Sequence, residues 1–224
     1  MNSISERAQK LIFDREFANS ELTMHEDHPR VKWLKEFSEY AAEQKLCGEV
    51  AECGVFRGNF AYYINKYFFK HTLYLFDTFE GFNAVDIKTE KSLDDPDFES
   101  GRFGEDRSHK AFRGTNEKYV LSKMPYPQKC VIKKGYFPET AKDIKEKFCF
   151  VNLDMDLYQP MLEGLRYFYP CMKGGGGGVI LMHDFFNNDL PGVKKAVVDF
   201  EQEAGFKLAK MPIGDGCSLA VINL

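Results

Sequence analysis

The chain has 224 residues, of which 44% are hydrophobic and 29% are charged, a composition typical of one folded globular domain. Its net charge of −4, from 30 Lys and Arg against 34 Asp and Glu, argues against a general nucleic-acid-binding protein. No apolar stretch is long enough to span a membrane, and residues 1–17 lack the continuous apolar region of a secretory signal. We therefore expect a cytoplasmic protein without nucleic-acid or membrane partners.

Helices are predicted first, over residues 4–19 and 30–46 within an N-terminal segment 1–47, because apolar residues recur there near a period of 3.6. Short apolar runs then alternate with helical patterns. The predicted strands are 49–53, 73–76, 130–132, 148–153 and 179–182, and the predicted helices are 59–69, 139–147, 158–170 and 191–204. Two last strands, 206–208 and 218–222, leave no room for a helix between them and predict an antiparallel hairpin. This order predicts a Rossmann-like, doubly wound α/β fold with a seven-stranded sheet.

An insertion over residues 82–128 interrupts this alternation inside the single domain. It is rich in charge and glycine, and only residues 108–123 have a helical pattern. Long irregular insertions in compact domains are often lids over a site. His109, which lies there among basic residues, is a candidate for assisting proton transfer, although the segment is also compatible with a solvated surface loop.

Glycines and a carboxylate follow the first predicted strand. Glu52, Gly54 and Gly58 have the spacing ExGxxxG, whereas a dinucleotide site requires GxGxxG. Glu52 would repel a pyrophosphate but would suit a cation such as the ammonium of a methionine moiety. Asp77, at the end of the second strand, is placed to accept the hydroxyl protons of a ribose. Together these acids indicate S-adenosylmethionine rather than NAD, although each alone could cap a strand end or a turn.

A second group of acids follows the fourth and fifth predicted strands. Asp154, Asp156, His183 and Asp184 are expected to meet at the carboxyl edge of the sheet. Carboxylates suit Mg²⁺, which could hold neighbouring hydroxyls of a substrate, and Asp156 could accept a proton. The alternative is that Asp154 and Asp184 cap helices and that His183 is a structural histidine.

The motifs around these residues resemble those of the TylF/MycF (macrocin-type) O-methyltransferases. The resembling segments are Val50–Gly58 (VAECGVFRG), Leu75–Phe82 (LFDTFEGF), Lys134–Thr140 (KGYFPET), Leu153–Tyr158 (LDMDLY) and Gly192–Val197 (GVKKAV). The resemblance covers about residues 48–205 apart from the insertion. It implies a class I S-adenosylmethionine-dependent methyltransferase that methylates a sugar hydroxyl with Mg²⁺.

Site roles follow from this resemblance position by position. It implies that Glu52, Gly54 and Gly58 line the methionine end of the cofactor, that Asp77 and Thr78 lie at the ribose, and that Tyr136 and Phe137 lie near the adenine. It also implies that Asp156 is the general base and that Asp154, His183 and Asp184 hold the metal. His183-Asp184 departs from the two aspartates that are usual in the family, and a His-Asp pair would differ from them in metal affinity or in choice of metal.

The sequence thus predicts an S-adenosylmethionine-dependent O-methyltransferase whose acceptor is a nucleotide-linked sugar, a surface polysaccharide or a glycosylated metabolite. Two alternatives stay open, a nucleotide-dependent oxidoreductase on a Rossmann-like fold and a non-catalytic binding subunit. Aromatic residues at helical spacing over 62–69 and the resemblance favour a homo-oligomer. Scattered cysteines without a CxxC pair predict free thiols.

Overall fold

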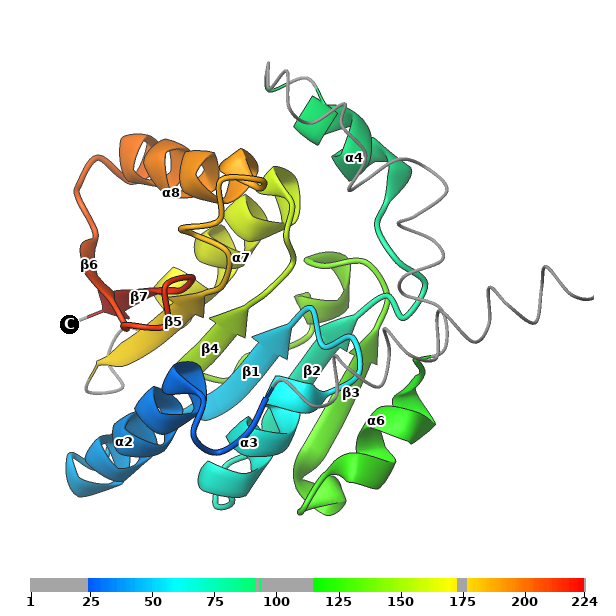
Figure 1. Ribbon diagram of the computed structural model, residues 1–224, viewed down its shortest axis with the longest axis vertical. Helices are drawn as coiled ribbons and strands as arrows, with labels where there is room; N and C mark the ends of the chain where they lie inside the picture. Colours follow the sequence, from blue (N-terminus) through cyan, green and yellow to red (C-terminus); the bar gives the residue numbers. More distant parts are fainter. Residues whose placement is uncertain (1–23, 92, 94–114, 173–176, 224) are drawn as a thin grey trace, which may run out of the picture.

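The computed structural model describes residues 24–91, 93, 115–172 and 177–223. Over these residues, seven strands form one sheet in the order β3-β2-β1-β4-β5-β7-β6 (Figure 1). The strands are β1 (Glu49–Cys53), β2 (Leu73–Asp77), β3 (Cys130–Lys134), β4 (Phe148–Leu153), β5 (Gly178–Met182), β6 (Ala209–Pro212) and β7 (Leu219–Asn223). The predicted doubly wound α/β fold is confirmed.

The first five strands are parallel, and the strand order reverses between β1 and β4. Strand β1 pairs with β2 on one side and with β4 on the other. Every residue of β4 is buried, as expected for a central strand covered on both faces. In open parallel sheets such a switch point opens a crevice at the carboxyl ends of the strands.

Helices cover both faces of the sheet (Figure 1). One face carries α2 (Pro29–Glu43), α3 (Asn59–Tyr67) and α6 (Glu117–Lys123), and the other carries α7 (Tyr158–Cys171) and α8 (Pro191–Ala204). Short 3-10 turns lie at Pro127–Lys129 and Glu139–Ala141. None of the helices in the described ranges is long and apolar enough to cross a membrane.

The abundance of phenylalanine is explained by the two cores on either side of the sheet. Phe148 packs edge-on against Phe168 of α7 with ring centroids 5.1 Å apart, while Phe150 stacks on Phe68, which follows α3, at 5.6 Å. In a regular strand, residues two apart point to the same face. Phe148 and Phe150 face opposite cores because the pairing register of β1 and β4 shifts between these positions. Aromatic pairs add stabilisation beyond the area that they bury.

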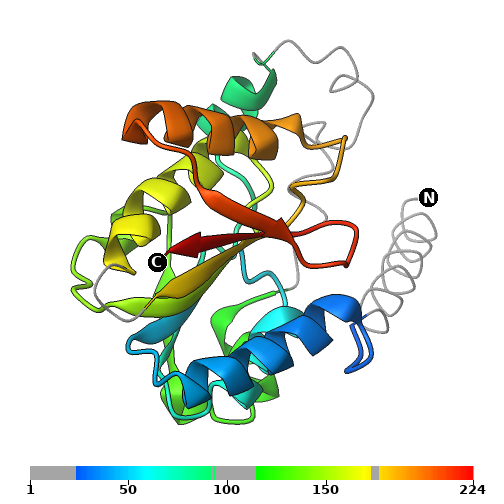
Figure 2. The ribbon, with the colours of Figure 1, turned by 90° about the vertical axis from the view of Figure 1, so that its left-hand side faces the viewer.

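The sheet ends in the predicted antiparallel hairpin, in which β7 pairs with β5 and with β6 (Figure 2). The strand expected over 206–208 begins three residues later, at Ala209. Glu201 of α8 explains this shift, because its Oε1 accepts the backbone N–H of Leu208 at 3.0 Å and its Oε2 binds Lys207 Nζ at 2.7 Å. These contacts hold residues 207 and 208 against the end of α8.

Two predictions for the connecting segments are wrong. The insertion contains an additional helix, α4 (Ala84–Lys91), which the sequence hides because Ile87 is its only buried apolar side chain. Asn83 starts this helix by accepting the N–H of Val85 at 2.8 Å, and α4 packs against α7. The helix expected over 139–147 is one 3-10 turn, because the chain must then extend to reach β4. The helix at 4–19 and residues 108–114 lie outside the described residues.

Candidate active site

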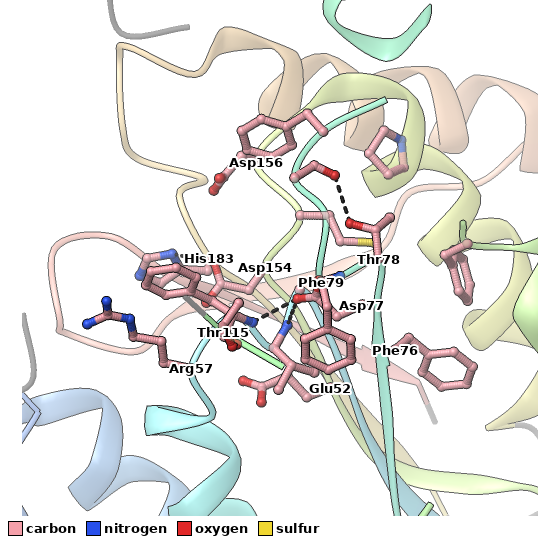
Figure 3. A pocket seen from close by; sticks show the side chains of 18 of the residues that line it. Glu52, Arg57, Phe76, Asp77, Thr78, Phe79, Thr115, Asp154, Asp156 and His183 are labelled. Carbon is pink, nitrogen blue, oxygen red and sulfur yellow. Dashed lines mark hydrogen bonds and ion pairs between the residues drawn. The ribbon is translucent and has the colours of Figure 1, made fainter. Parts of the chain in front are cut away.

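A cavity of about 410 Å³ lies at the carboxyl ends of the parallel strands (Figure 3). The predicted residues that line it are Glu52, Gly54, Asp77, Thr78, Tyr136, Phe137, Asp154, Asp156, His183 and Asp184. Gly58 is not among the lining residues, and His109 lies outside the described residues. Acids that follow β1, β2, β4 and β5 therefore line one cavity.

The glycines of the first turn are required by neighbouring protein atoms. Gly54 has φ 84°, and a Cβ there would lie 1.8 Å from the backbone oxygen of Asp154. Gly58 has φ 73°, and a Cβ there would lie 3.0 Å from a side-chain carbon of Val120 in α6. Both glycines therefore let the turn after β1 pack tightly, and Gly54 brings this turn against the end of β4.

Asp77 holds the same turn from the neighbouring strand. Its Oδ2 accepts the backbone N–H groups of Val55 and Phe56, both at 2.7 Å, and its Oδ1 accepts that of Phe79 at 2.6 Å. A carboxylate has about four acceptor positions. Three of them are used here, so Asp77 orders the turn and keeps room for about one further hydrogen bond from a ligand.

Glu52 is a buried carboxylate that faces the cavity with one oxygen unpaired. It is 2% exposed, and its Oε1 accepts the side-chain N–H of Asn152 at 3.0 Å. Its Oε2 has no hydrogen-bond partner among the described residues. Burial, and then the nearby charge of Asp154, raise the pKa of Glu52 well above its ordinary value. A buried orphaned carboxylate oxygen is an expected place for a cationic group of a ligand.

The side chains expected near the nucleoside have structural contacts of their own. Thr78 Oγ1 donates to the carbonyl of Gly81 at 2.7 Å, which closes the turn after β2. Tyr136 donates to Asp86 of α4 at 2.9 Å, and burial and this carboxylate raise the pKa of Tyr136. Phe137 is 5% exposed and stacks on Phe168 at 5.6 Å. Phe137 therefore forms an apolar wall that continues into the core.

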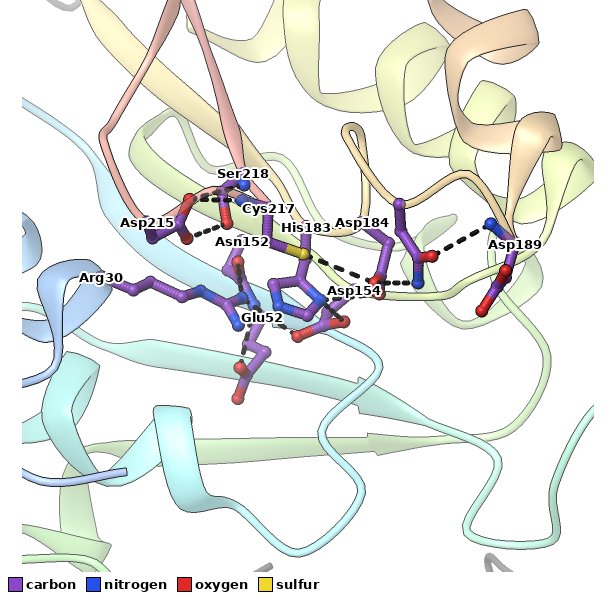
Figure 4. A network of polar contacts seen from close by, with 11 residues as sticks. Arg30, Glu52, Asn152, Asp154, His183, Asp184, Asp189, Asp215, Cys217 and Ser218 are labelled. Carbon is purple, nitrogen blue, oxygen red and sulfur yellow. Dashed lines mark hydrogen bonds and ion pairs between the residues drawn. The ribbon is translucent and has the colours of Figure 1, made fainter. Parts of the chain in front are cut away.

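The histidine and two aspartates of the acid cluster form one ionic network. His183 Nδ1 lies 2.9 Å from Asp154 Oδ1 and 2.7 Å from Asp184 Oδ2 (Figure 4). Burial disfavours the charged imidazole, but Asp154 and Asp184 outweigh it and raise the pKa of His183. Burial likewise opposes ionisation of Asp154, yet His183 and Arg30 hold its pKa well below the ordinary value. His183 is thus paired with both predicted metal-binding carboxylates.

Asp156 lies beside this network and forms no ion pair with any of the described residues. Burial, followed by the charges of Asp154 and Asp184, raises the pKa of Asp156 well above its ordinary value. Asp156 and Asp184 have φ angles of 61° and 58°, a left-handed conformation that aspartate tolerates better than most residues. Figure 3 shows Asp154, Asp156 and His183 on one side of the cavity, with Phe76 on the other.

The donor atoms of the cluster fit a divalent cation. One carboxylate oxygen from each of Asp154, Asp156 and Asp184 lies within 4.8 Å of the others. Mg²⁺ prefers such oxygen ligands, and a cation would relieve the repulsion between the carboxylates. A second set of possible ligands, His183, Asp184 and Cys217, overlaps the first.

The sequence interpretation missed Arg30 and Asn152, which hold the acids of the site in place. Arg30 of α2 is 2% exposed and donates to Asn152 and to Asp154, at 2.7 and 3.0 Å. A charged residue on the apolar side of a helix, and an amide inside the apolar strand FCFVNL, are patterns that could have pointed to them. Arg57, which is fully buried, also lines the cavity.

The fold matches solved methyltransferase structures. It superposes on the O-methyltransferase NovP with a TM-score of 0.67 at 18% identity, covering 86% of this chain and 78% of that one. CalS11, a calicheamicin methyltransferase, superposes with a TM-score of 0.56 at 18% sequence identity, covering 84% of this chain and 77% of that one. Cofactor-bound Rv0187 from MTB superposes with a TM-score of 0.57 at 11% sequence identity, covering 90% of this chain and 82% of that one. No curated protein matches the chain. The protein has the Rossmann-like α/β fold of the methyltransferases.

Residues 6–216 match the model of the macrocin-O-methyltransferase (TylF) family. The chain belongs to this family and is an S-adenosylmethionine-dependent O-methyltransferase. The assignment favours methyl transfer over the nucleotide-dependent oxidoreductase that the fold alone leaves open.

Proposed function

We propose that the protein methylates a hydroxyl group of a sugar, and that the cavity at the switch point binds both reactants. The observation that carries this proposal is the convergence in one cavity of Glu52, with its unpaired buried oxygen, and the acids Asp154, Asp156 and Asp184. A sugar acceptor is supported by the family and by CalS11, whose apo structure is described as that of a TDP-rhamnose 3'-O-methyltransferase. Its TM-score is 0.52 at 17% identity, with 84% of this chain and 77% of that one covered.

The methionine end of S-adenosylmethionine would lie at Glu52. The Oε2 of Glu52 would accept from the ammonium group, which would relieve the cost of the buried carboxylate. Asp77 would accept one ribose hydroxyl proton with its remaining acceptor position, beside Thr78. Tyr136 and Phe137 would border the adenine. Gly54 and Gly58 would shape the turn after β1, beside the methionine end. The cofactor supplies the methyl group as an electrophilic sulfonium.

Asp156 is the proposed general base. It lines the cavity next to Asp154 and Asp184, so an acceptor hydroxyl there would lie within reach of its carboxylate. Asp156 would take the hydroxyl proton as the oxygen attacks the methyl carbon in line with the departing sulfur. Holding both reactants in this alignment would supply much of the rate.

Mg²⁺ would be held by Asp154 and Asp184, with His183 as the third predicted ligand. When bound, it would lower the pKa of an acceptor hydroxyl. His183 Nδ1 lies within 3 Å of an oxygen of each carboxylate, so it holds both of them in place.

The test is calorimetric titration with S-adenosylhomocysteine, with NAD⁺ as the control ligand, followed by incubation with S-adenosylmethionine and a panel of nucleotide-linked sugars. Saturable binding of the first ligand alone and a sugar product heavier by one methylene are expected. Binding of NAD⁺ would instead support the oxidoreductase, and binding without turnover of any sugar would support a non-catalytic subunit. Polysaccharide fragments and glycosylated metabolites extend the panel.

The remaining expectations stay predictions. A homo-oligomer is supported by Phe69 and Tyr126, which are 48% and 38% exposed and form a ring pair 6.0 Å apart on the outside of the α3 face. Within the predicted aromatic group at 62–69, Tyr63 and Phe68 are buried and belong to the core. A cytoplasmic location, and the lack of nucleic-acid and membrane partners, rest on the sequence. Light scattering at several protein concentrations tests the oligomer.

A further inference from the structure

Arg30 is a buried cation that comes from outside the strand and helix motifs of the site. It is the second residue of α2, yet only 2% of it is exposed. Burying a charged side chain costs free energy unless it is paired and hydrogen-bonded. Its guanidinium lies 4.0 Å from the ring centre of Phe60 in α3, so one face is covered by an aromatic ring. The polar edge points to the ends of the central strands.

At that edge one nitrogen of Arg30 contacts both Asn152 and Asp154. Its NH2 group donates to Asn152 Oδ1 at 2.7 Å and to Asp154 Oδ2 at 3.0 Å (Figure 4). Asn152 in turn donates from Nδ2 to Glu52 Oε1 at 3.0 Å. A continuous chain of hydrogen bonds therefore runs from the acid cluster at Asp154, through Arg30 and Asn152, to the carboxylate proposed to bind the cofactor.

The direction of this chain follows from hydrogen-bond chemistry. Arginine is a donor only, so it requires the oxygen of the Asn152 amide. The amide nitrogen of Asn152 must then face Glu52, and an N–H donor stabilises Glu52 as an ionised acceptor. A partner with an acceptor in place of Arg30 would allow the amide to turn, and Glu52 would lose the hydrogen bond that supports its charge.

We propose that Arg30 is a positioning residue that orients Glu52 through Asn152 for the ammonium group of the cofactor, while it holds Asp154 in the acid cluster. The inference rests on the proposed role of Glu52. It makes α2 a part of the cofactor site, and it predicts that Arg30 acts on one portion of the ligand only, the amino-acid end.

Two ligands separate this role from a merely structural one. S-adenosylhomocysteine carries the ammonium group, whereas methylthioadenosine keeps the adenosine and the thioether but lacks the amino acid. Calorimetry on Arg30→Met should show about a tenfold loss of affinity for S-adenosylhomocysteine, the scale of one lost charge-assisted hydrogen bond. Affinity for methylthioadenosine should stay within about twofold of the parent value. Arg30→Lys, which keeps the charge without the planar fork, should recover part of the loss.

Controls come from the chain itself. Arg166→Met removes a guanidinium that pairs with Glu163 and Glu203 away from the cavity, and both affinities should stay unchanged. Asn152→Ser keeps the contact of Arg30 with Asp154 but breaks the link to Glu52, so it should give the same selective loss even if Arg30→Met is too unstable to measure. Glu52→Gln should also weaken binding of S-adenosylhomocysteine selectively. The double variant with Arg30→Met should lose little more affinity than Glu52→Gln alone.

Equal losses for the two ligands, or unchanged affinity for S-adenosylhomocysteine in folded Arg30→Met or Asn152→Ser, would overturn the positioning role. A parent protein that binds neither ligand would refute the proposed cofactor site itself, and the inference with it. A parent that binds S-adenosylhomocysteine while the variants show no selective loss would refute the inference alone.

Discussion

Gly54 and Asp154 meet where β1 and β4 end, so closely that a Cβ on Gly54 would lie 1.8 Å from the carbonyl oxygen of Asp154. The neighbouring atom is backbone and cannot rotate away. The turn that carries Glu52 and the strand end that carries the acid cluster are therefore fixed relative to each other, and any side chain at position 54 must push them apart.

Gly54→Ala should consequently destabilise the fold by about 3–4 kcal/mol, combining overpacking with a left-handed backbone conformation. The matched control is Gly214→Ala. Gly214 has φ 85°, almost equal to the 84° of Gly54, but no atom of the described residues beyond its two chain neighbours lies within 4 Å of its added Cβ. The control should cost only about 1 kcal/mol, the backbone strain alone. Urea unfolding measures both, and equal losses would show that the contact with Asp154 does not matter.

Asp156→Asn should lower kcat about 100-fold or more, because general-base catalysis typically contributes that much. The amide cannot take the hydroxyl proton, whereas the cofactor subsite at Glu52 is untouched. Affinity for S-adenosylhomocysteine should therefore stay within about twofold of the parent value. Asp143→Asn, at an exposed position, is the control for loss of one charge. Near-normal kcat in Asp156→Asn would contradict its assignment as the base.

Asp154→Asn should abolish the response of the enzyme to Mg²⁺, because it removes a predicted metal ligand and the partner shared by Arg30 and His183. The parent enzyme should lose activity in excess chelator and regain it when Mg²⁺ is returned. Mn²⁺ binding, counted by electron paramagnetic resonance, gives a readout that is independent of turnover. A parent enzyme equally active in chelator, and unable to bind Mn²⁺, would refute the metal site.

The sequence predicts the fold well because its strands have strong local signals. The buried run FCFVNL and the alternation of strands with amphipathic helices fix the parallel sheet. The ends of elements are less well predicted where a side chain far along the chain decides them. Helix α4 lacks apolar periodicity, and the start of β6 depends on Glu201, so neither is visible in local patterns.

The candidate site shows the same division. Acids at strand ends could be brought together from topology alone, because parallel strands place their carboxyl ends at one edge. Their partners could not be predicted in this way. Arg30 reaches Asp154 across 124 positions of sequence, and Asp77 binds the turn after β1 across 21 and 22 positions, contacts that only the folded chain brings together.

Glu201 makes the free energy of unfolding fall as the pH becomes acidic. Burial alone would raise its pKa, but hydrogen bonds from Lys207, Lys210 and the backbone of Leu208 lower it to about 2. This value lies below the ordinary glutamate value of about 4.3. Its contribution is therefore complete above about pH 5 and is lost as the pH falls toward 2.

We expect this group to contribute of the order of 2 kcal/mol at neutral pH, less than the full shift implies, because Lys207 is largely exposed and its charge is screened. Glu201→Gln should remove most of this contribution, and its curve of unfolding free energy against pH should be flatter than that of the parent between about pH 5 and pH 3. Glu139→Gln, in a surface pair with Lys142, is the control and should leave the curve unchanged. Parallel curves for Glu201→Gln and the parent would show that Glu201 titrates equally in the folded and unfolded states.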